Sequence, residues 1–187
     1  MKHALIITAL LIKTVFSFSK TKADSISVTF PKILIVNDKN EILLSFDNNR
    51  KAYEVPSNGL INGPISFKSY IDTMAKEIGI SYRSFRLGGI FTYIFPDKYR
   101  TFIRPYFVVQ FSKYTNGTNL LDTAYKWFSF NEALKEIKYP ASEKIVERLM
   151  KKIKNVWAAT FEEYGYTNPI DVSKIKFRII EDFYKIN

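Results

Sequence analysis

Residues 53–80 read YEVPSNGLINGPISFKSYIDTMAKEIGI, and the order of structures in this stretch decides the fold. An extended piece over 53–56 leads into a loop that is rich in Gly and Asn. A helix is predicted over 66–78, because Ser66 is a suitable N-cap and Gly79 suits a helix C-terminus. Its buried face consists of apolar residues at helical spacing: Phe67, Ile71, Met74, Ala75 and Ile78.

Runs of β-branched, apolar and aromatic residues on both sides of this helix predict strands. Residues 25–46 predict a hairpin around a polar turn at 37–40, and residues 85–114 predict a second hairpin that turns at 96–98. Residues 124–128 predict one more strand. We therefore expect a sheet that is mostly not parallel.

Helices are predicted to follow these strands. A short helix over 129–137 precedes a long helix that begins at Ser142 and reaches about Tyr164. Residues 165–187 are expected to form one more helix. The predicted fold is therefore α+β, a mixed sheet packed between helices with a C-terminal helical extension.

The composition excludes several kinds of chemistry. The 187 residues fit one domain with a terminal appendage. The chain has no Cys, which excludes disulfides, a thiolate nucleophile and Cys-ligated zinc. Its one His is His3, so a serine–histidine–aspartate triad and multi-His metal sites lack their essential residue. The net charge of +10 favours anionic partners, namely nucleotides, nucleic acid or acidic membranes.

Residues 1–24 have the composition of an export signal. A basic start precedes the apolar run 4–12, which has the length of a signal-peptide hydrophobic region. We therefore expect a signal peptide or N-terminal anchor over 1–24, a folded domain over 25–164 and an extension over 165–187. Such a signal would make the protein periplasmic or secreted. Because Lys13 interrupts the apolar run, the alternative is a buried N-terminal strand or helix in a cytoplasmic protein.

Three stretches, in this order, resemble parts of the Nudix hydrolase superfamily across about residues 26–150. Residues 33–44 (ILIVNDKNEILL) look like the family's first strand pair, and residues 53–58 (YEVPSN) are similar to the Trp-Glu-Leu-Pro-Gly-Gly sequence that leads into the Nudix box. Residues 126–134 (KWFSFNEAL), followed by Tyr139-Pro140, look like its late strand and short helix. The resemblance implies a Nudix-like sheet between helices and, as the family's activity, Mg²⁺-dependent hydrolysis of a nucleoside diphosphate linked to another group.

The Nudix box itself is degenerate in this chain. The family pattern is Gly, five residues, Glu, seven residues, Arg-Glu, an apolar residue, any residue, Glu-Glu, any residue, Gly and an apolar residue. Aligned without gaps on residues 58–80, the chain keeps four positions: Met74, Glu77, Gly79 and Ile80. It replaces five others: the first Gly by Asn58, the first Glu by Pro64, the Arg by Asp72, the next Glu by Thr73 and the first Glu of the pair by Lys76.

These replacements weaken the metal site that the resemblance implies. Mg²⁺ needs several hard oxygen ligands, and the family supplies carboxylates from one helix face. Here that face offers Thr73, Lys76 and Glu77. Glu77 is therefore the one remaining candidate metal ligand, and it is also the candidate catalytic residue if the protein is active. A rebuilt site would need carboxylates from elsewhere, such as Glu54 or Asp97.

Four further residues are candidates for ligand binding. Arg86 and Arg104 flank the second hairpin and could grip phosphate through bidentate hydrogen bonds. The alternative for these arginines is a solvated strand edge. Tyr53 and Phe91 could stack on a base, and their alternative is the core, where aromatic residues of sheets usually lie.

Three functional hypotheses follow from the sequence. The favoured one is a non-catalytic or weakly active Nudix-fold module that binds a nucleotide-like or other anionic ligand. The alternative is a divergent Nudix hydrolase that cleaves a nucleoside-diphosphate-linked substrate with Mg²⁺. The second alternative is an exported basic protein whose surface binds nucleic acid or acidic lipid. The box loses charged residues and gains Lys76 and Pro64, and we therefore rank the binding module above the hydrolase.

Overall fold

The computed structural model describes residues 26–61, 63–96, 100–115 and 124–187. The predicted signal or anchor over 1–24 and the candidate ligand Asp97 lie outside these residues. Within the described ranges, no helix combines the length and the apolar character needed to cross a membrane.

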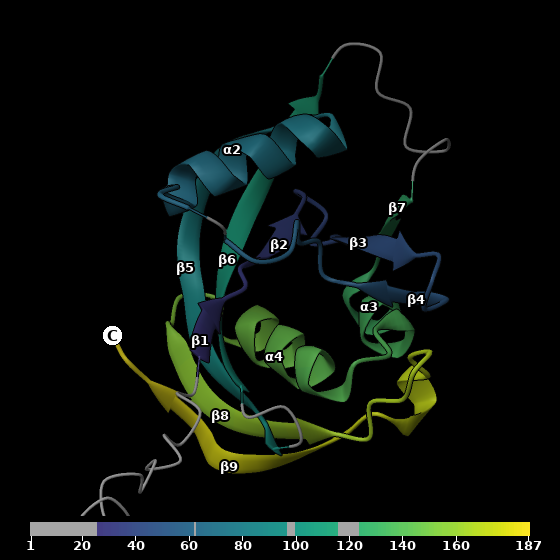
Figure 1. The fold of residues 1–187 in the computed structure, drawn as a ribbon. Helices are drawn as coiled ribbons and strands as arrows, with labels where there is room; N and C mark the ends of the chain where they lie inside the picture. The colour runs from purple at the N-terminus through teal and green to yellow at the C-terminus, as the bar shows by residue number, and fades with distance from the viewer. Residues whose placement is uncertain (1–25, 62, 97–99, 116–123) are drawn as a thin grey trace, which may run out of the picture.

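One mixed sheet of nine strands organises the described residues (Figure 1). Its strand order is β4-β3-β2-β6-β5-β8-β9, with β1 beside β6 and β7 beside β3. Both β1 and β2 run parallel to β6, β5 runs parallel to β8, and the other pairs are antiparallel. The strands are β1 (Ile26–Thr29), β2 (Lys32–Val36), β3 (Ile42–Asp47), β4 (Ala52–Glu54), β5 (Ile80–Phe95), β6 (Arg100–Tyr114), β7 (Tyr125–Phe128), β8 (Trp157–Tyr164) and β9 (Lys176–Lys185).

Helices cover both faces of this sheet. The helical segments are α2 (Phe67–Ile78), α3 (Phe130–Glu136), α4 (Pro140–Lys151) and the 3₁₀ turn η3 (Val172–Lys174). The helix α2 lies on one face, whereas α3 and α4 lie on the other (Figure 1). Side chains of β2 alternate between the two layers, because Ile33 and Ile35 pack under α2 while Leu34 and Val36 pack under α3 and α4. Both faces of the central strands are therefore buried.

The predicted helix before β5 is present as α2, with the predicted caps. Ser66 Oγ accepts a hydrogen bond from the Ser69 amide (3.1 Å), and Gly79 ends the helix at φ 79° in the left-handed region. Its buried face includes Tyr70, which the sequence analysis did not assign to it. Phe67, predicted to be buried, is 43% exposed.

The predicted long helix from Ser142 to Tyr164 is wrong. The helix α4 begins at Pro140 and ends at Lys151, and Trp157–Tyr164 form strand β8 instead. This strand lies inside the sheet, parallel to β5 and antiparallel to β9. The apolar residues of WAATFEEY fit both the spacing of a helix and the two-residue alternation of a strand. The strand forms because this segment pairs with β5, which is distant along the chain.

The predicted C-terminal helix is also wrong, because Lys176–Lys185 form strand β9 at the end of the sheet. The rings of Phe177 and Phe183 lie 5.8 and 5.7 Å from the ring of Phe161 in the core. Burial of these two rings against β8 accounts for a strand in place of a free helix. The α+β class and the mixed sheet between helices are confirmed, and the helical nature of the C-terminal extension is corrected.

Gly89 of β5 leaves space for the backbone of β8, with which it pairs at Trp157. A Cβ atom here would lie 2.6 Å from the carbonyl oxygen of Trp157. We expect Gly89→Ala to lower the free energy of unfolding by about 3 kcal/mol, because the oxygen that the new Cβ meets belongs to the backbone of a paired strand. At Gly88 a Cβ would first meet the side chain of Val108, at 3.0 Å, so Gly88→Ala should be milder. Urea unfolding of both variants measures the difference, and equal losses would contradict the close β5–β8 packing.

Candidate functional site

On the sheet face that carries α4, the inward side chains change from apolar to charged along the strands. On β6 the series is Val108, Tyr106 and Arg104, and on β8 Phe161 is followed by Glu163. Because side chains two residues apart share a face, these strands bring their charges to one end of the core. We call the resulting group the charged cluster: Lys32, Glu54, Arg104 and Glu163.

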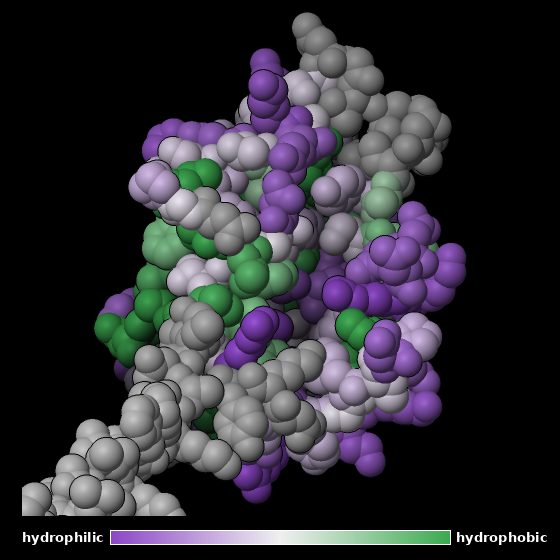
Figure 2. Space-filling model, in the orientation of Figure 1, coloured by the Kyte–Doolittle hydropathy of each residue, from purple (hydrophilic) through white to green (hydrophobic). Residues whose placement is uncertain are grey.

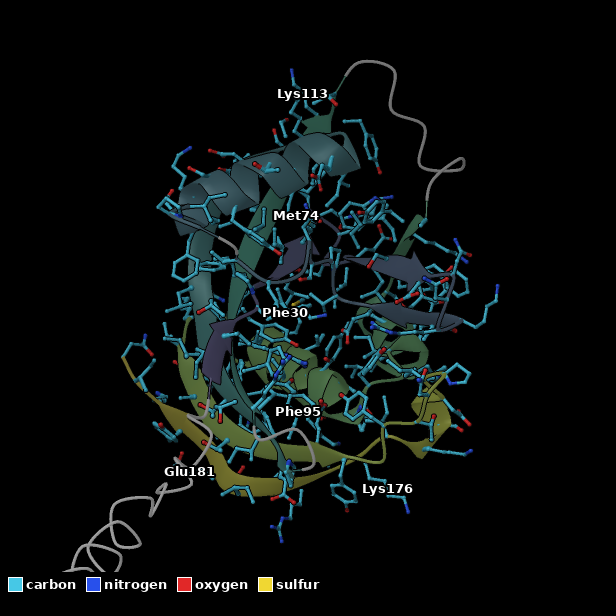
Figure 3. All side chains as sticks on the ribbon, in the orientation of Figure 1. Phe30, Met74, Phe95, Lys113, Lys176 and Glu181 are labelled. Atoms are coloured by element: carbon cyan, nitrogen blue, oxygen red, sulfur yellow. The ribbon has the colours of Figure 1, made fainter. Side chains whose placement is uncertain are left out.

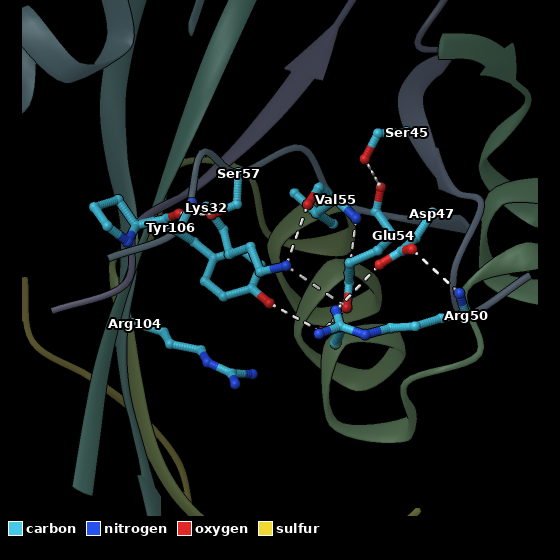
Figure 4. A network of polar contacts seen from close by, with 12 residues as sticks. Lys32, Ser45, Asp47, Arg50, Glu54, Val55, Ser57, Arg104 and Tyr106 are labelled. Atoms are coloured by element: carbon cyan, nitrogen blue, oxygen red, sulfur yellow. Dashed lines mark hydrogen bonds and ion pairs between the residues drawn. The ribbon is translucent and has the colours of Figure 1, made fainter. Parts of the chain in front are cut away.

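Lys32 and Glu54 form one half of the charged cluster (Figure 4). The Lys32 ammonium lies 3.7 Å from Glu54 Oε2 and donates to the carbonyl oxygen of Val55 (3.3 Å). Ser142 Oγ of α4 donates to Glu54 Oε2 (2.9 Å), so the Tyr106 hydroxyl, 3.2 Å away, donates to Ser142. Burial lowers the pKa of Lys32 to about 8, and the opposing attraction of Glu54 is smaller.

Arg104 and Glu163 form the other half, which is less completely paired. The Arg104 guanidinium carbon lies 3.8 Å from the centre of the Tyr93 ring, and its Nη1 is 4.0 Å from Glu163 Oε2. The same carboxylate oxygen accepts from the Tyr166 hydroxyl (2.6 Å). Burial raises the pKa of the Glu163 carboxyl. Within the described residues, Arg104 Nε and Glu163 Oε1 have no hydrogen-bond partner.

Aromatic rings surround the two cations of the charged cluster. The Phe30 ring centre is 5.5 Å from Lys32 Nζ and 5.4 Å from the guanidinium carbon of Arg104. Phe95, labelled with Phe30 in Figure 3, lies 5.9 Å from the same guanidinium carbon. Such rings hold a cation in place without neutralising it. The Arg104 side chain is 12% exposed, whereas that of Glu163 is fully buried.

Glu77, the carboxylate that remains in the degenerate box, lies on the exposed side of α2. Hydrophilic side chains cover this outer side of the helix (Figure 2). Both Glu77 oxygens accept from Asn58 Nδ2, at 3.0 Å each. Asn58 stands in the loop where the box has its first Gly. The side chain that this replacement introduces thus forms hydrogen bonds with Glu77, the carboxylate that the helix keeps.

The described residues around Glu77 do not fit the Mg²⁺ ion that the resemblance implies. Among the residues that the structure describes, no three His, Cys, Asp or Glu side chains gather as a ligand set. Asn58 turns its amide N–H group to Glu77, and an N–H donor cannot act as a ligand. Glu54, the predicted substitute ligand, belongs to the charged cluster and pairs with Lys32.

The structure brings one of the four predicted ligand-binding residues, Arg104, into the charged cluster. Arg86 donates to two backbone carbonyl oxygens, at 3.0 and 3.5 Å. Phe91 is fully buried in the core. Tyr53 packs between two rings whose centres are each 4.9 Å away. Phe91 thus lies in the core, and the half-buried Tyr53 packs against it.

The sequence analysis missed Lys32 and Glu163. Lys32 begins the apolar run KILIV, which forms a strand buried on both faces. A single Lys at an inward position of such a strand is the sequence feature that could have identified it as a buried charge. Glu163 falls in the segment predicted as a helix, where its inward position on β8 has no sequence signal. The two missed residues each pair with a charge that the sequence analysis had named, namely Glu54 and Arg104.

No protein-family profile matches the sequence, and no curated protein matches it. Solved structures do match the fold. The mutator MutT protein of Bacillus halodurans is 16% identical with a TM-score of 0.63, covering 82% of this chain and 97% of its own. The E. coli ORF135 protein is 18% identical with a TM-score of 0.54, covering 68% and 91%. A Nudix hydrolase from Nitrosomonas europaea is 20% identical with a TM-score of 0.52, covering 65% and 87%. These likenesses show the Nudix fold, as the sequence resemblance implied.

The lowered pKa of Lys32 predicts a pH-dependent stability. The unfolded chain keeps the Lys32 proton up to about pH 10.5, whereas the folded chain loses it near pH 8. Because the unfolded state binds more protons in between, the free energy of unfolding should rise by up to about 2 kcal/mol from pH 7.5 to 9.5. Lys32→Met should remove this rise. Urea unfolding of both proteins at pH 7.5 and at pH 9.5 measures this rise. An equal rise in the original protein and in Lys32→Met would contradict the prediction.

Proposed function

We propose that this chain, which has the Nudix fold, is a non-catalytic or weakly active module that binds a nucleotide-like or other anionic ligand at the charged cluster. The observation that carries the proposal is the incomplete pairing of Arg104 with Glu163. Burying a charge whose hydrogen-bonding atoms are unpaired costs free energy. A ligand that forms hydrogen bonds with these atoms offsets this cost. Residues that serve packing alone have no such need.

The chemistry of the charged cluster defines the kind of ligand. Arg104 offers its unpaired Nε–H and Lys32 its ammonium group, which suit the oxygens of a phosphate. The unpaired Glu163 Oε1 accepts hydrogen bonds, which suits an amide or amino group on a ring. Phe30, against both cations, offers an aromatic surface to such a ring. A nucleotide joins these features in one molecule.

One observation favours the hydrolase alternative. Glu77 occupies a box position on the exposed face of α2, where solvent can reach it. Hydrolysis would require Mg²⁺ to displace Asn58 from this carboxylate and to find its other ligands among waters and substrate oxygens. We rank this alternative second because the neighbouring box positions are Thr73 and Lys76, which add no carboxylate.

Binding to nucleoside diphosphates and their conjugates, measured by calorimetry with and without Mg²⁺, separates the two functions. We expect binding without Mg²⁺ that Arg104→Met weakens at least about tenfold, because a charge-assisted hydrogen bond is lost. Glu77→Gln should leave the affinity unchanged. Arg178→Met, at an exposed Arg paired with Glu162, is the matched control and should also bind normally.

The same compounds are then tested as substrates. Release of phosphate or of a nucleoside monophosphate that needs Mg²⁺ and disappears in Glu77→Gln would overturn the proposal in favour of the hydrolase. Unaltered binding by Arg104→Met would remove the charged cluster as the site.

A further inference from the structure

A pocket lined mainly by charged residues lies on a different side of α4 from the charged cluster. It has a volume of about 250 Å³, and the residues that line it are Lys144, Glu147, Arg148, Lys151, Lys152 and Phe183. Ser142 is the residue of α4 that contacts Glu54. Arg148 follows six positions later, which places it about 120° away from Ser142 around the helix, so it projects from another face. The two sites are therefore separate.

Arg148 is held in place by two aromatic rings. Its guanidinium carbon lies 4.9 Å from the ring centre of Trp157 on β8 and 4.9 Å from that of Phe183 on β9. In the described part of the chain, no carboxylate or carbonyl oxygen pairs with this guanidinium group. Its N–H donors are thus fixed in position and unused, which lowers the entropic cost of binding an anion.

The pocket carries an excess of positive charge. Lys144 and Lys151 share the carboxylate of Glu147, at 3.6 and 2.7 Å. Lys152 and Arg148 add two cations, and Lys144 also lies 3.9 Å from Glu143 Oε1, so four positive side chains face two negative ones, a net charge of +2. A multiply charged anion matches this surplus better than a single carboxylate does.

We propose that the pocket between α4 and β9 is a second anion site, which binds a phosphoryl group through Arg148 and the lysines of α4. The planar guanidinium group supplies two parallel N–H donors to phosphate oxygens, and the ammonium groups supply the remaining charge. The group can belong to a free phosphate compound or to a phospholipid headgroup. This site is independent of the ligand proposed for the charged cluster.

Titration calorimetry of the full chain with pyrophosphate tests the site, together with sedimentation on phosphatidylcholine vesicles that contain phosphatidic acid. Both experiments are run in the Arg104→Met background, so that the charged cluster does not contribute. We expect Arg148→Met to weaken binding at least about tenfold, and Arg148→Lys to weaken it less, since the cation remains over the rings. Lys174→Gln, at an exposed Lys of η3, is the control and should bind as the background does.

A second variant, Lys151→Gln/Lys152→Gln, guards against a folding defect, because both lysines are exposed. It should weaken binding several-fold and leave the thermal melting temperature unchanged. If these substitutions weaken pyrophosphate binding, the ligand is a free phosphate compound. If they weaken vesicle binding alone, the ligand is a phospholipid headgroup. Binding of neither probe, or binding that Arg148→Met and the double variant leave unchanged, would overturn the proposal.

Discussion

Burial of both faces of the sheet is the constraint on which the rest of the structure depends. The central strands lie between α2 on one side and α3 and α4 on the other, so a charge on them loses its hydration and needs a partner in the protein. Lys32 meets this need with Glu54 and a backbone carbonyl group. Arg104 meets it only in part, with an aromatic ring and a carboxylate 4.0 Å away. The Arg104–Glu163 half is therefore the less completely paired of the two.

The degenerate box and the charged cluster are complementary findings. In the box, Asn58 donates to both oxygens of Glu77, and the part of the chain that the structure describes gathers no three His, Cys, Asp or Glu side chains for a divalent cation. In the cluster, cations and carboxylates remain together in the core, although salt bridges of this kind are costly to bury. A chain under no demand for ligand binding gains little stability from such a group. Within the described residues, charges of both signs thus gather in the charged cluster, whereas no set of metal-ligating side chains gathers around Glu77.

The parts of the fold that depend on neighbours in the chain could be predicted from the sequence. Ser66 and Gly79 mark the ends of α2 because capping is local, and the first hairpin follows from its polar turn. The strands β8 and β9 could not be predicted, because the pairing of Gly89 with Trp157 joins distant residues. Arg104 was recognisable as a cation on a strand, but its partner Glu163 depends on that pairing.

The charged cluster draws Lys32 from β2 and Glu163 from β8. A nascent chain still on the ribosome therefore cannot assemble it until β8 has emerged, and a fragment that ends before β8 leaves Arg104 without its carboxylate. A ligand bound by both halves, as the proposed function requires, would therefore recognise only chains in which β8 is in place. Since binding stabilises the state that binds, it would also protect the C-terminal strands from proteolytic trimming. Ligand occupancy would then act as a check on the integrity of the polypeptide.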